Sequence, residues 1–117
     1  MTVLLTRTVY QAPGESLPRR LSGPALLSNS AVTLYSAWRS AGLTMLHVSN
    51  PSGSALDVTI SIGSDAQGTR ILDSYAIRAD WAGSFKCYYV LQAGEVLQGF
   101  ASVGSVATLT VSGYEIT

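Results

Sequence analysis

The chain has 117 residues, of which 47% are hydrophobic and only 12% are charged, and its seven Lys and Arg residues balance seven Asp and Glu residues. A charged share about half that of an ordinary soluble domain predicts an exterior of Ser, Thr, Gly and apolar groups, which associates readily with other protein surfaces. Zero net charge removes the basic footprint that nucleic-acid binding needs, so we expect protein partners and no nucleic acid.

The cysteine count and the apolar runs indicate where such a protein is made. Cys87 is the only cysteine, so no internal disulfide can form. The first residues lack the Lys/Arg-led apolar run of a secretory signal, and Ser, Thr and Gly interrupt every apolar stretch well before the ~18 residues of a membrane span. We therefore expect synthesis in a reducing cytoplasm and no membrane partner.

Residues 1–30 are predicted to form an extended N-terminal arm or edge strand. The run Thr2–Tyr10 reads as extended chain. After it, any regular ladder is expected to be broken by Pro13, Gly14, Pro18, Gly23 and Pro24.

This arm is locally basic although the whole chain is neutral. Arg7, Arg19 and Arg20 stand there against Glu15 alone. Two interpretations of Thr2–Tyr10 remain open: an edge strand of the chain's own sheet, and an arm that orders on a neighbour by strand addition.

Residues 31–117 are predicted to form one antiparallel β-sandwich domain, because short runs rich in Val, Ile, Thr and Tyr alternate with Gly, Ser, Asn and Pro clusters. In the clearest run, Ala55–Gly63, apolar and polar residues alternate from Leu56 to Ile62. The runs are Ala31–Ala37, Leu43–Ser49, Ala55–Gly63, Thr69–Ala79, Ser84–Leu91, Val96–Val103 and Val106–Ile116. With the arm, we expect an all-β, jelly-roll-like fold of about seven to eight strands.

Two connections are predicted to close β-hairpins. The segment Asn50-Pro51-Ser52-Gly53 has turn chemistry and joins Leu43–Ser49 to Ala55–Gly63. Gly104-Ser105 suits a type II′ turn between the last two runs, because Gly reaches the first turn position without strain. Short connections leave no room for parallel crossovers, so neighbours in sequence are expected to pair antiparallel.

The nucleophilic and basic side chains predict no catalytic site. His47 is the only histidine, which excludes a multi-histidine metal site, and its strand flanks favour a structural or surface role. Cys87 alternates with Phe85 and Tyr89 on one strand face, which favours a small buried side chain over a reactive thiol, although Lys86 is adjacent.

The acidic residues outside the arm carry no recognisable signature either. Asp65, Asp80 and Glu95 lie in predicted turns, where hydrogen bonds to the backbone account for them. The chain has no phosphate-binding loop, dinucleotide fingerprint or calcium loop. We expect a protein that is not an enzyme and has no metal or cofactor.

The aromatic residues leave one binding function open. Trp38, Trp81, Tyr88 and Tyr89 together would suit a platform on which a sugar stacks, as in a carbohydrate-binding module. Both tryptophans lie beside predicted turns, where they could equally cover the ends of the core or anchor a protein interface.

From about Ser30 to Thr117 the order of segments resembles a group of small β-sandwich proteins encoded among the structural genes of tailed bacteriophages and phage-like particles. The segments that carry the resemblance are AVTLYSA (31–37), LHVSNPSGS (46–54) leading into VTISI (58–62), LQAGEVL (91–97) and LTVSGYEI (109–116). The Ala-Gly-Glu turn and the Val-Ser-Gly ending each recur in many β proteins, while their joint order is less common. The region before Ala31 does not match the group.

The resemblance implies a structural protein of the virion, made in the bacterial host cytoplasm, with capsid decoration or cementing preferred over a neck, tail or fibre-base role. Implied partners are the major capsid protein, or neck and tail proteins, and further copies of the chain, with a trimer preferred. The group brings no catalytic residues. The residues expected to contact partners are Arg7, Arg19, Arg20, Trp38 and Trp81.

Overall fold

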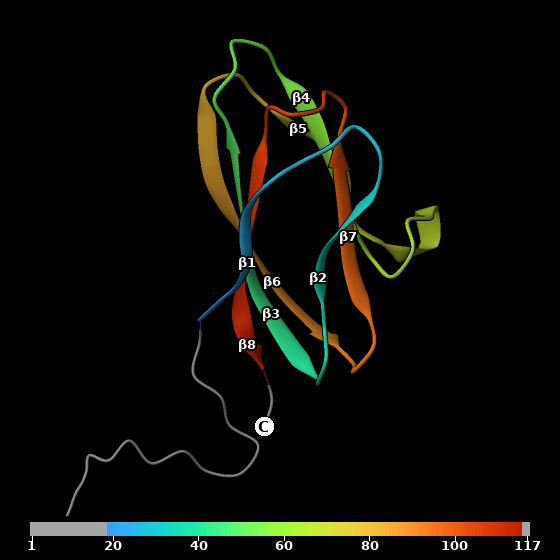
Figure 1. Cartoon of the computed structure of the whole chain (residues 1–117). Helices are drawn as coiled ribbons and strands as arrows, with labels where there is room; N and C mark the ends of the chain where they lie inside the picture. The colour runs from blue at the N-terminus through green and yellow to red at the C-terminus, as the bar shows by residue number, and fades with distance from the viewer. Residues whose placement is uncertain (1–18, 116–117) are drawn as a thin grey trace, which may run out of the picture.

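The computed structural model describes residues 19–115, which form an all-β protein of two layers (Figure 1). Eight strands make up two four-stranded antiparallel sheets. The strands are β1 (Arg19–Leu26), β2 (Val32–Ser36), β3 (Ala41–Asn50), β4 (Leu56–Ile62), β5 (Arg70–Ile77), β6 (Trp81–Leu91), β7 (Val96–Ala101) and β8 (Thr108–Glu115). A 3-10 turn, η1 (Gln67–Thr69), is the one helical element in this part of the chain, and no helix there is long and apolar enough to cross a membrane.

The strand order is that of a jelly roll. One sheet has the order β1-β8-β3-β6 and the other the order β2-β7-β4-β5. The first strand thus pairs with the last, the second with the seventh, the third with the sixth and the fourth with the fifth, as in a long antiparallel ribbon rolled into two sheets. The predicted antiparallel, jelly-roll-like sandwich is confirmed.

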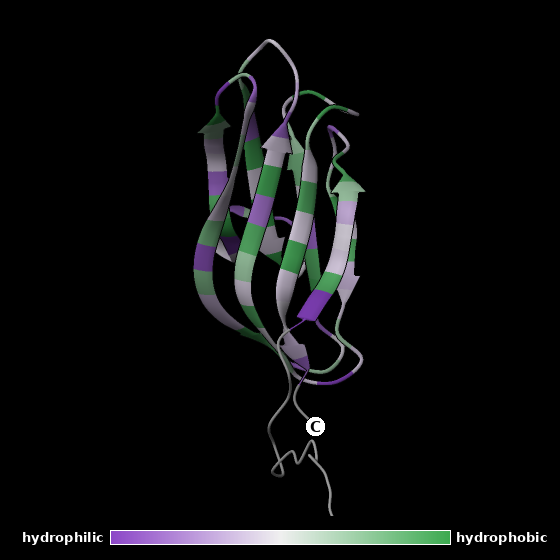
Figure 2. Ribbon diagram, turned by 90° about the vertical axis from the view of Figure 1, so that its left-hand side faces the viewer, coloured by the Kyte–Doolittle hydropathy of each residue, from purple (hydrophilic) through white to green (hydrophobic). Residues whose placement is uncertain are grey.

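The core lies between the sheets because alternate residues of each strand point inward. In β4, Leu56, Val58 and Ile60 are buried, and from the facing sheet Val48 and Leu109 pack into the same cluster. Figure 2 shows the resulting hydrophobic and hydrophilic bands along the strands. Each such side chain contributes about 1.5–3 kcal/mol on burial, so this alternation is the main source of stability.

The seven predicted runs from Ala31 onward each contain a strand. The largest difference in their boundaries is at β6, which begins at Trp81 rather than at Ser84. β3 continues to Asn50, which pairs with Trp81. The hydrogen-bonded ladder between β3 and β6 therefore extends beyond the residues whose alternation predicted the two strands.

An eighth strand lies where the sequence predicted an interrupted arm. β1 covers Arg19–Leu26 and pairs with β8 at the edge of its sheet. Gly23, with a φ of 91°, and Pro24 are tolerated because an edge strand needs ladder donors on one side only and two register shifts absorb the irregularity. In the described residues the sandwich thus includes β1, an edge strand that precedes Ala31. The run Thr2–Tyr10 lies outside the described residues, so its two interpretations stay predictions.

Both predicted hairpins are wrong, since β3 and β4 belong to different sheets and so do β7 and β8. Among the strands that the structure describes, the only sequence neighbours that pair are β4 and β5. Turn residues report that the chain reverses direction, but not whether it returns to the same sheet or crosses to the other one. At Gly104-Ser105, it is Ser105 that adopts the left-handed conformation, with a φ of 63°.

Candidate interaction surface

The five residues predicted to contact partners do not form one cluster. Arg19 and Trp38 meet at a carboxylate of β8 near one end of the sandwich. Trp81 begins β6 at the opposite end of that sheet, where it packs against the core. Arg20 is exposed on the edge strand β1, and Arg7 lies outside the described residues.

The carboxylate of Glu115 holds three elements together in a group that we call the Glu115 cluster: Arg19, Tyr35, Trp38 and Glu115. Arg19 forms an ion pair with its Oε1 atom. The Tyr35 hydroxyl donates a hydrogen bond to Oε2 over 3.0 Å, and the Trp38 Nε1–H donates to the same atom over 2.9 Å. The Glu115 side chain is only 12% exposed, and burial raises the pKa of the Tyr35 hydroxyl despite the opposing effect of Arg19.

The cluster fixes an exposed indole. Trp38 is 66% exposed, although its Nε1–H is bound to Glu115. The guanidinium of Arg39 lies 3.7 Å from the centroid of the ring and covers one of its faces. A large aromatic side chain that is already held in one orientation loses little conformational entropy on contact with a partner, which is typical of interface anchors.

A second exposed apolar group lies on β6, at the edge of its sheet. Tyr88 is 89% exposed, Val90 is 59% exposed and Tyr89 is 40% exposed. The only charged residue in this strand is Lys86. An edge strand presents unpaired N–H and C=O groups, so apolar side chains and backbone groups are available here together.

A groove of about 430 Å³ runs beside this strand, and we call it the β5/β6 groove. Ile71 and Leu72 of β5 line one side, Phe85 and Cys87 of β6 line the other, and Leu46 of β3 also contributes. Burial raises the pKa of the Cys87 thiol, which keeps it neutral near pH 7. Cys87 packs against the core, as the strand pattern predicted.

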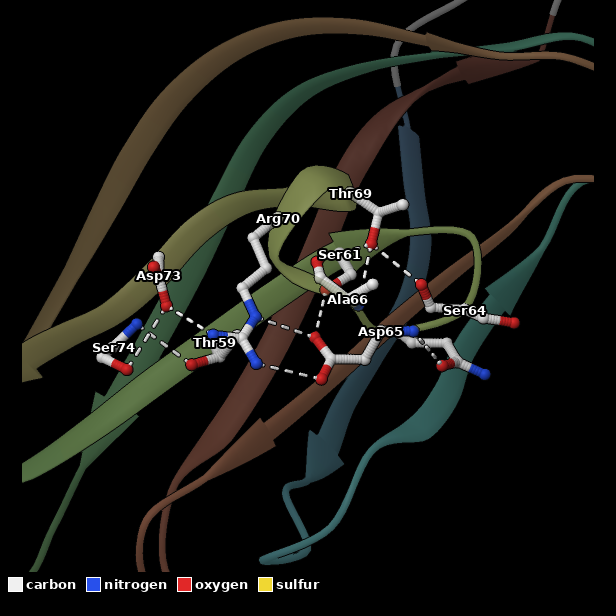
Figure 3. Close-up of polar contacts among 10 residues, drawn as sticks. Thr59, Ser61, Ser64, Asp65, Ala66, Thr69, Arg70, Asp73 and Ser74 are labelled. Atoms are coloured by element: carbon white, nitrogen blue, oxygen red, sulfur yellow. Dashed lines mark hydrogen bonds and ion pairs between the residues drawn. The ribbon is translucent and has the colours of Figure 1, made fainter.

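On the outer face of the other sheet, Arg70 bridges two carboxylates (Figure 3). Its Nε and Nη2 atoms donate to the two oxygens of Asp65 over 3.1 and 3.2 Å, and its Nη1 donates to Asp73 over 2.8 Å. The Ser61 hydroxyl also donates to Asp65, over 2.6 Å. This network holds the β4–β5 connection over the sheet, where Thr59 and Ser61 are buried. Asp65 is therefore an ion-pair residue and not only the turn residue that the sequence predicted.

The free energy of unfolding of the Asp65→Asn variant is expected to fall less at acidic pH than that of the parent chain. Hydrogen bonds from Arg70 and Ser61 lower the pKa of Asp65 in the folded state. Its contribution to stability is present above the unfolded pKa of about 3.9 and is lost as the pH falls through the lower folded value. Urea unfolding between pH 7 and pH 2.5 measures this, with Asp80→Asn as the matched control. Equal acid dependence in the parent and Asp65→Asn proteins would contradict the role of the ion pair.

The remaining candidates for chemistry have structural surroundings. His47 is exposed, and its Nδ1 lies 2.9 Å from the Ser84 hydroxyl. Asp80 adopts a left-handed turn conformation, and Glu95 accepts a hydrogen bond from the Gln92 backbone N–H over 2.7 Å, so the predicted turn positions of both residues are confirmed. Within residues 19–115 no group of three His, Cys, Asp or Glu side chains is arranged to hold a metal ion.

The aromatic residues do not share one surface. Trp38 lies near Glu115, whereas Trp81 is paired with Asn50 at the far end of β3, ten residues or about 30 Å of strand away. Trp81 packs beside Phe85, with ring centroids 6.2 Å apart, and Phe85 makes an edge contact with Tyr75. The two tryptophans therefore cannot stack on one short sugar chain.

The sequence matches no known protein family and no curated protein. Among solved structures, the chain is similar to a protein of Bacillus endospore appendages, described as disulfide-linked pili, with a TM-score of 0.53, 11% identity, and 92% of this chain and 95% of that one covered. A capsid chain of cyanophage Pam1 has a TM-score of 0.49 at 11% identity, with 93% and 94% covered. A chain of infectious bursal disease virus has a TM-score of 0.48 at 12% identity, with 90% and 30% covered. At 11% identity the first likeness shows a common fold and nothing beyond it.

Proposed function

We propose that this chain is a non-enzymatic structural subunit of a bacteriophage particle, most simply a decoration or cement protein that stabilises the head through subunit contacts. The segment order described above, from Ser30 to Thr117, is what suggests a phage. The jelly roll is compatible with this role but does not assign it, because the same fold serves many functions.

The observation that carries the proposal is the exposure of large apolar side chains on a chain without net charge. Trp38, Tyr88 and Val90 are each more than half exposed. Burying such side chains against a partner contributes about 1.5–3 kcal/mol for each one, and a neutral surface offers no long-range repulsion between copies. The interaction is therefore proposed to rest on apolar burial, with Arg20 and the ion-paired Arg19 at its rim.

A particle-binding experiment tests this proposal. Heads assembled from the capsid proteins of the same genome, without this protein, are mixed with the full chain and sedimented. We expect saturable binding, occupancy of regular lattice positions in electron micrographs, and a higher temperature of head disassembly.

The Trp38→Ala variant is expected to bind the heads about thirtyfold more weakly, the effect of losing one interface hot spot. Arg78→Ala is the control, because it removes an exposed arginine at the other end of the sandwich. Binding to isolated tails or necks and not to heads would replace the decoration role by that of a neck, tail or fibre-base adaptor. Binding to none of these would refute a virion role.

A carbohydrate-binding attachment module is the second candidate, favoured by the exposure of the Trp38 indole. An indole face is a common platform for sugar rings, although Arg39 covers one face here. A glycan array distinguishes the two candidates. Binding that is lost in Trp38→Ala and kept in Trp81→Ala would support attachment to a host glycan.

A further inference from the structure

The four sheet edges of this jelly roll differ in how well they are protected from pairing with another strand. β1 contains Pro24 and two register shifts, and β2 has only five residues. β5 is interrupted by two register shifts and by Ser74, which has a φ of 48°. Prolines, shortness and irregularity are the usual means by which proteins block edge pairing.

β6 has little such protection. It is 11 residues long, contains no proline, and carries Lys86 as its only charge. Its ladder with β3 has a single register shift. Within residues 19–115 no strand pairs with its outer side, so the backbone groups there are open to a further strand.

The same edge adjoins the β5/β6 groove, so an added strand would also find an apolar surface. On the other side of the sandwich, β1 and β2 contact each other, and the Ser22 hydroxyl donates to the backbone oxygen of Leu34. On the β6 side, Tyr75 and Phe85 meet in an edge contact, and Ile71 and Leu72 line the open groove beside them. A strand placed there would pair its backbone with β6 and bury alternate side chains in the groove.

We propose that the β6 edge and the β5/β6 groove of one copy receive the segment Thr2–Tyr10 of a second copy as an added strand. The inference goes beyond the proposed function, because it names the acceptor and holds whatever particle the subunits build. It identifies the neighbour on which the N-terminal arm orders.

The sequence of the segment suits this site. In Thr2–Tyr10, Val3, Leu5 and Val9 fall on one face of an extended chain, and the other face carries three threonines together with Leu4 and Tyr10. Its nine residues span about 30 Å when extended, against about 36 Å for the 11 residues of β6. Arg7 shares the apolar face, and its long side chain can carry the guanidinium to water at the mouth of the groove.

The position of Arg19 favours a second copy as the acceptor over the chain's own edge. In the register, Arg19 of β1 lies level with Tyr89 of β6, with β8 and β3 between them. A strand added beyond β6 of the same copy would therefore lie four strand spacings, or about 19 Å, from Arg19. The eight residues 11–18 span at most about 26 Å and include two prolines, so they could reach that position only if they were almost fully extended. Arg19 lies near the end of the sandwich at which β6 finishes. On its own copy the segment would therefore run parallel to β6, whereas a second copy permits the more stable antiparallel pairing.

A contact from the arm of one copy to the groove of the next is head-to-tail. Such contacts generate closed rings when the rotation between copies closes, and filaments when it does not. Two copies can also exchange arms reciprocally about a two-fold axis, so the trimer expected from the sequence is one of the closed assemblies that this contact permits.

Cysteine cross-linking of the full chain tests the proposal, because Cys87 in the groove is the only native thiol. The variants Val3→Cys, Leu5→Cys and Val9→Cys are treated with diamide and compared with Thr6→Cys and Thr8→Cys as matched controls. A strand in one register brings only one residue within disulfide reach of Cys87, so we expect a disulfide to Cys87 of another copy from one of the first three positions, and little cross-linking from the other two or from the two controls. Non-reducing gels would then show covalent multimers, and mass spectrometry would identify the linked peptides.

Two results would overturn the proposal. A disulfide within one chain would place the segment on its own edge, and equal cross-linking from both sets of positions would mean that no strand is formed. Native mass spectrometry gives a second measurement without cysteine chemistry. Leu5→Asp is expected to abolish the multimers while Thr6→Asp keeps them, and a parent chain that stays monomeric in concentrated solution would refute the contact. These measurements need no phage heads, so their failure is separate from failure of the particle-binding experiment.

Discussion

The Asn50→Ala variant is expected to lose about 3 kcal/mol of unfolding free energy, because Asn50 is fully buried at the crossing from β3 to β4. The two N–H groups of its Nδ2 are shared among the backbone oxygens of Ser54, Ile77 and Arg78, which lie 3.0, 3.3 and 3.1 Å away. Its Oδ1 accepts from the backbone N–H of Ser52 over 3.1 Å and from the hydroxyl of the same residue over 2.8 Å. Alanine would leave several of these groups buried without partners, at about 1–3 kcal/mol for each one.

Urea unfolding of the parent and of three variants measures the effect. Ser52→Ala, the matched control, removes one hydroxyl from the same turn and is expected to cost less than about 1 kcal/mol. Asn50→Asp keeps the acceptor oxygen but loses the amide donor, so it should be no more stable than Asn50→Ala. If Asn50→Ala were as stable as Ser52→Ala, the crossing would not depend on this side chain.

Gly113→Ala is expected to be about as damaging, at about 3 kcal/mol, or to prevent folding altogether. A Cβ atom at Gly113 would lie 1.9 Å from the backbone oxygen of Gly42 in the neighbouring strand. The obstacle is backbone that belongs to the β3–β8 ladder, so it cannot move aside as a flexible side chain can. The two glycines let β3 and β8 approach closely beside the register shift that follows Leu43.

Thermal unfolding followed by far-UV circular dichroism provides the measurement, with Gly53→Ala as the control. A Cβ atom at Gly53 meets nothing within 4 Å, so that variant should stay within about 0.5 kcal/mol of the parent chain. Should both variants melt with the parent protein, the close approach of the two strands would not be required by the fold.

Strand positions could be predicted because alternation is a local property. In β4 the period of two that buries Leu56, Val58 and Ile60 is visible in the sequence. The assignment of each strand to a sheet is not local. The turn at Asn50 has the chemistry of a hairpin, but its side chain bonds to the backbone of Ile77 and Arg78, far along the chain, and this helps to fasten a crossing between sheets.

The same distinction explains what was missed at the candidate surface. Trp38 could be singled out beside its turn, but its fixed orientation depends on Glu115, 77 residues later. Tyr88 lies on an outer face by alternation, while its place on a sheet edge follows only from the strand order. Asp65 was the exception, since its partner Arg70 is five residues away and the opposite charges across a short connection could have indicated the ion pair.

The pairing of the first strand with the last has a practical consequence for engineering. Arg19 at the start of β1 and Glu115 at the end of β8 are joined by an ion pair, so the chain enters and leaves the sandwich at the same pole. A cargo protein joined directly at Arg19 or at Glu115 would lie at that pole and leave the opposite one, with the turns around Asn50 and Asp80, unobstructed. The neighbouring ends also suit circular permutation, in which a short linker joins them and new termini are opened in a distant turn.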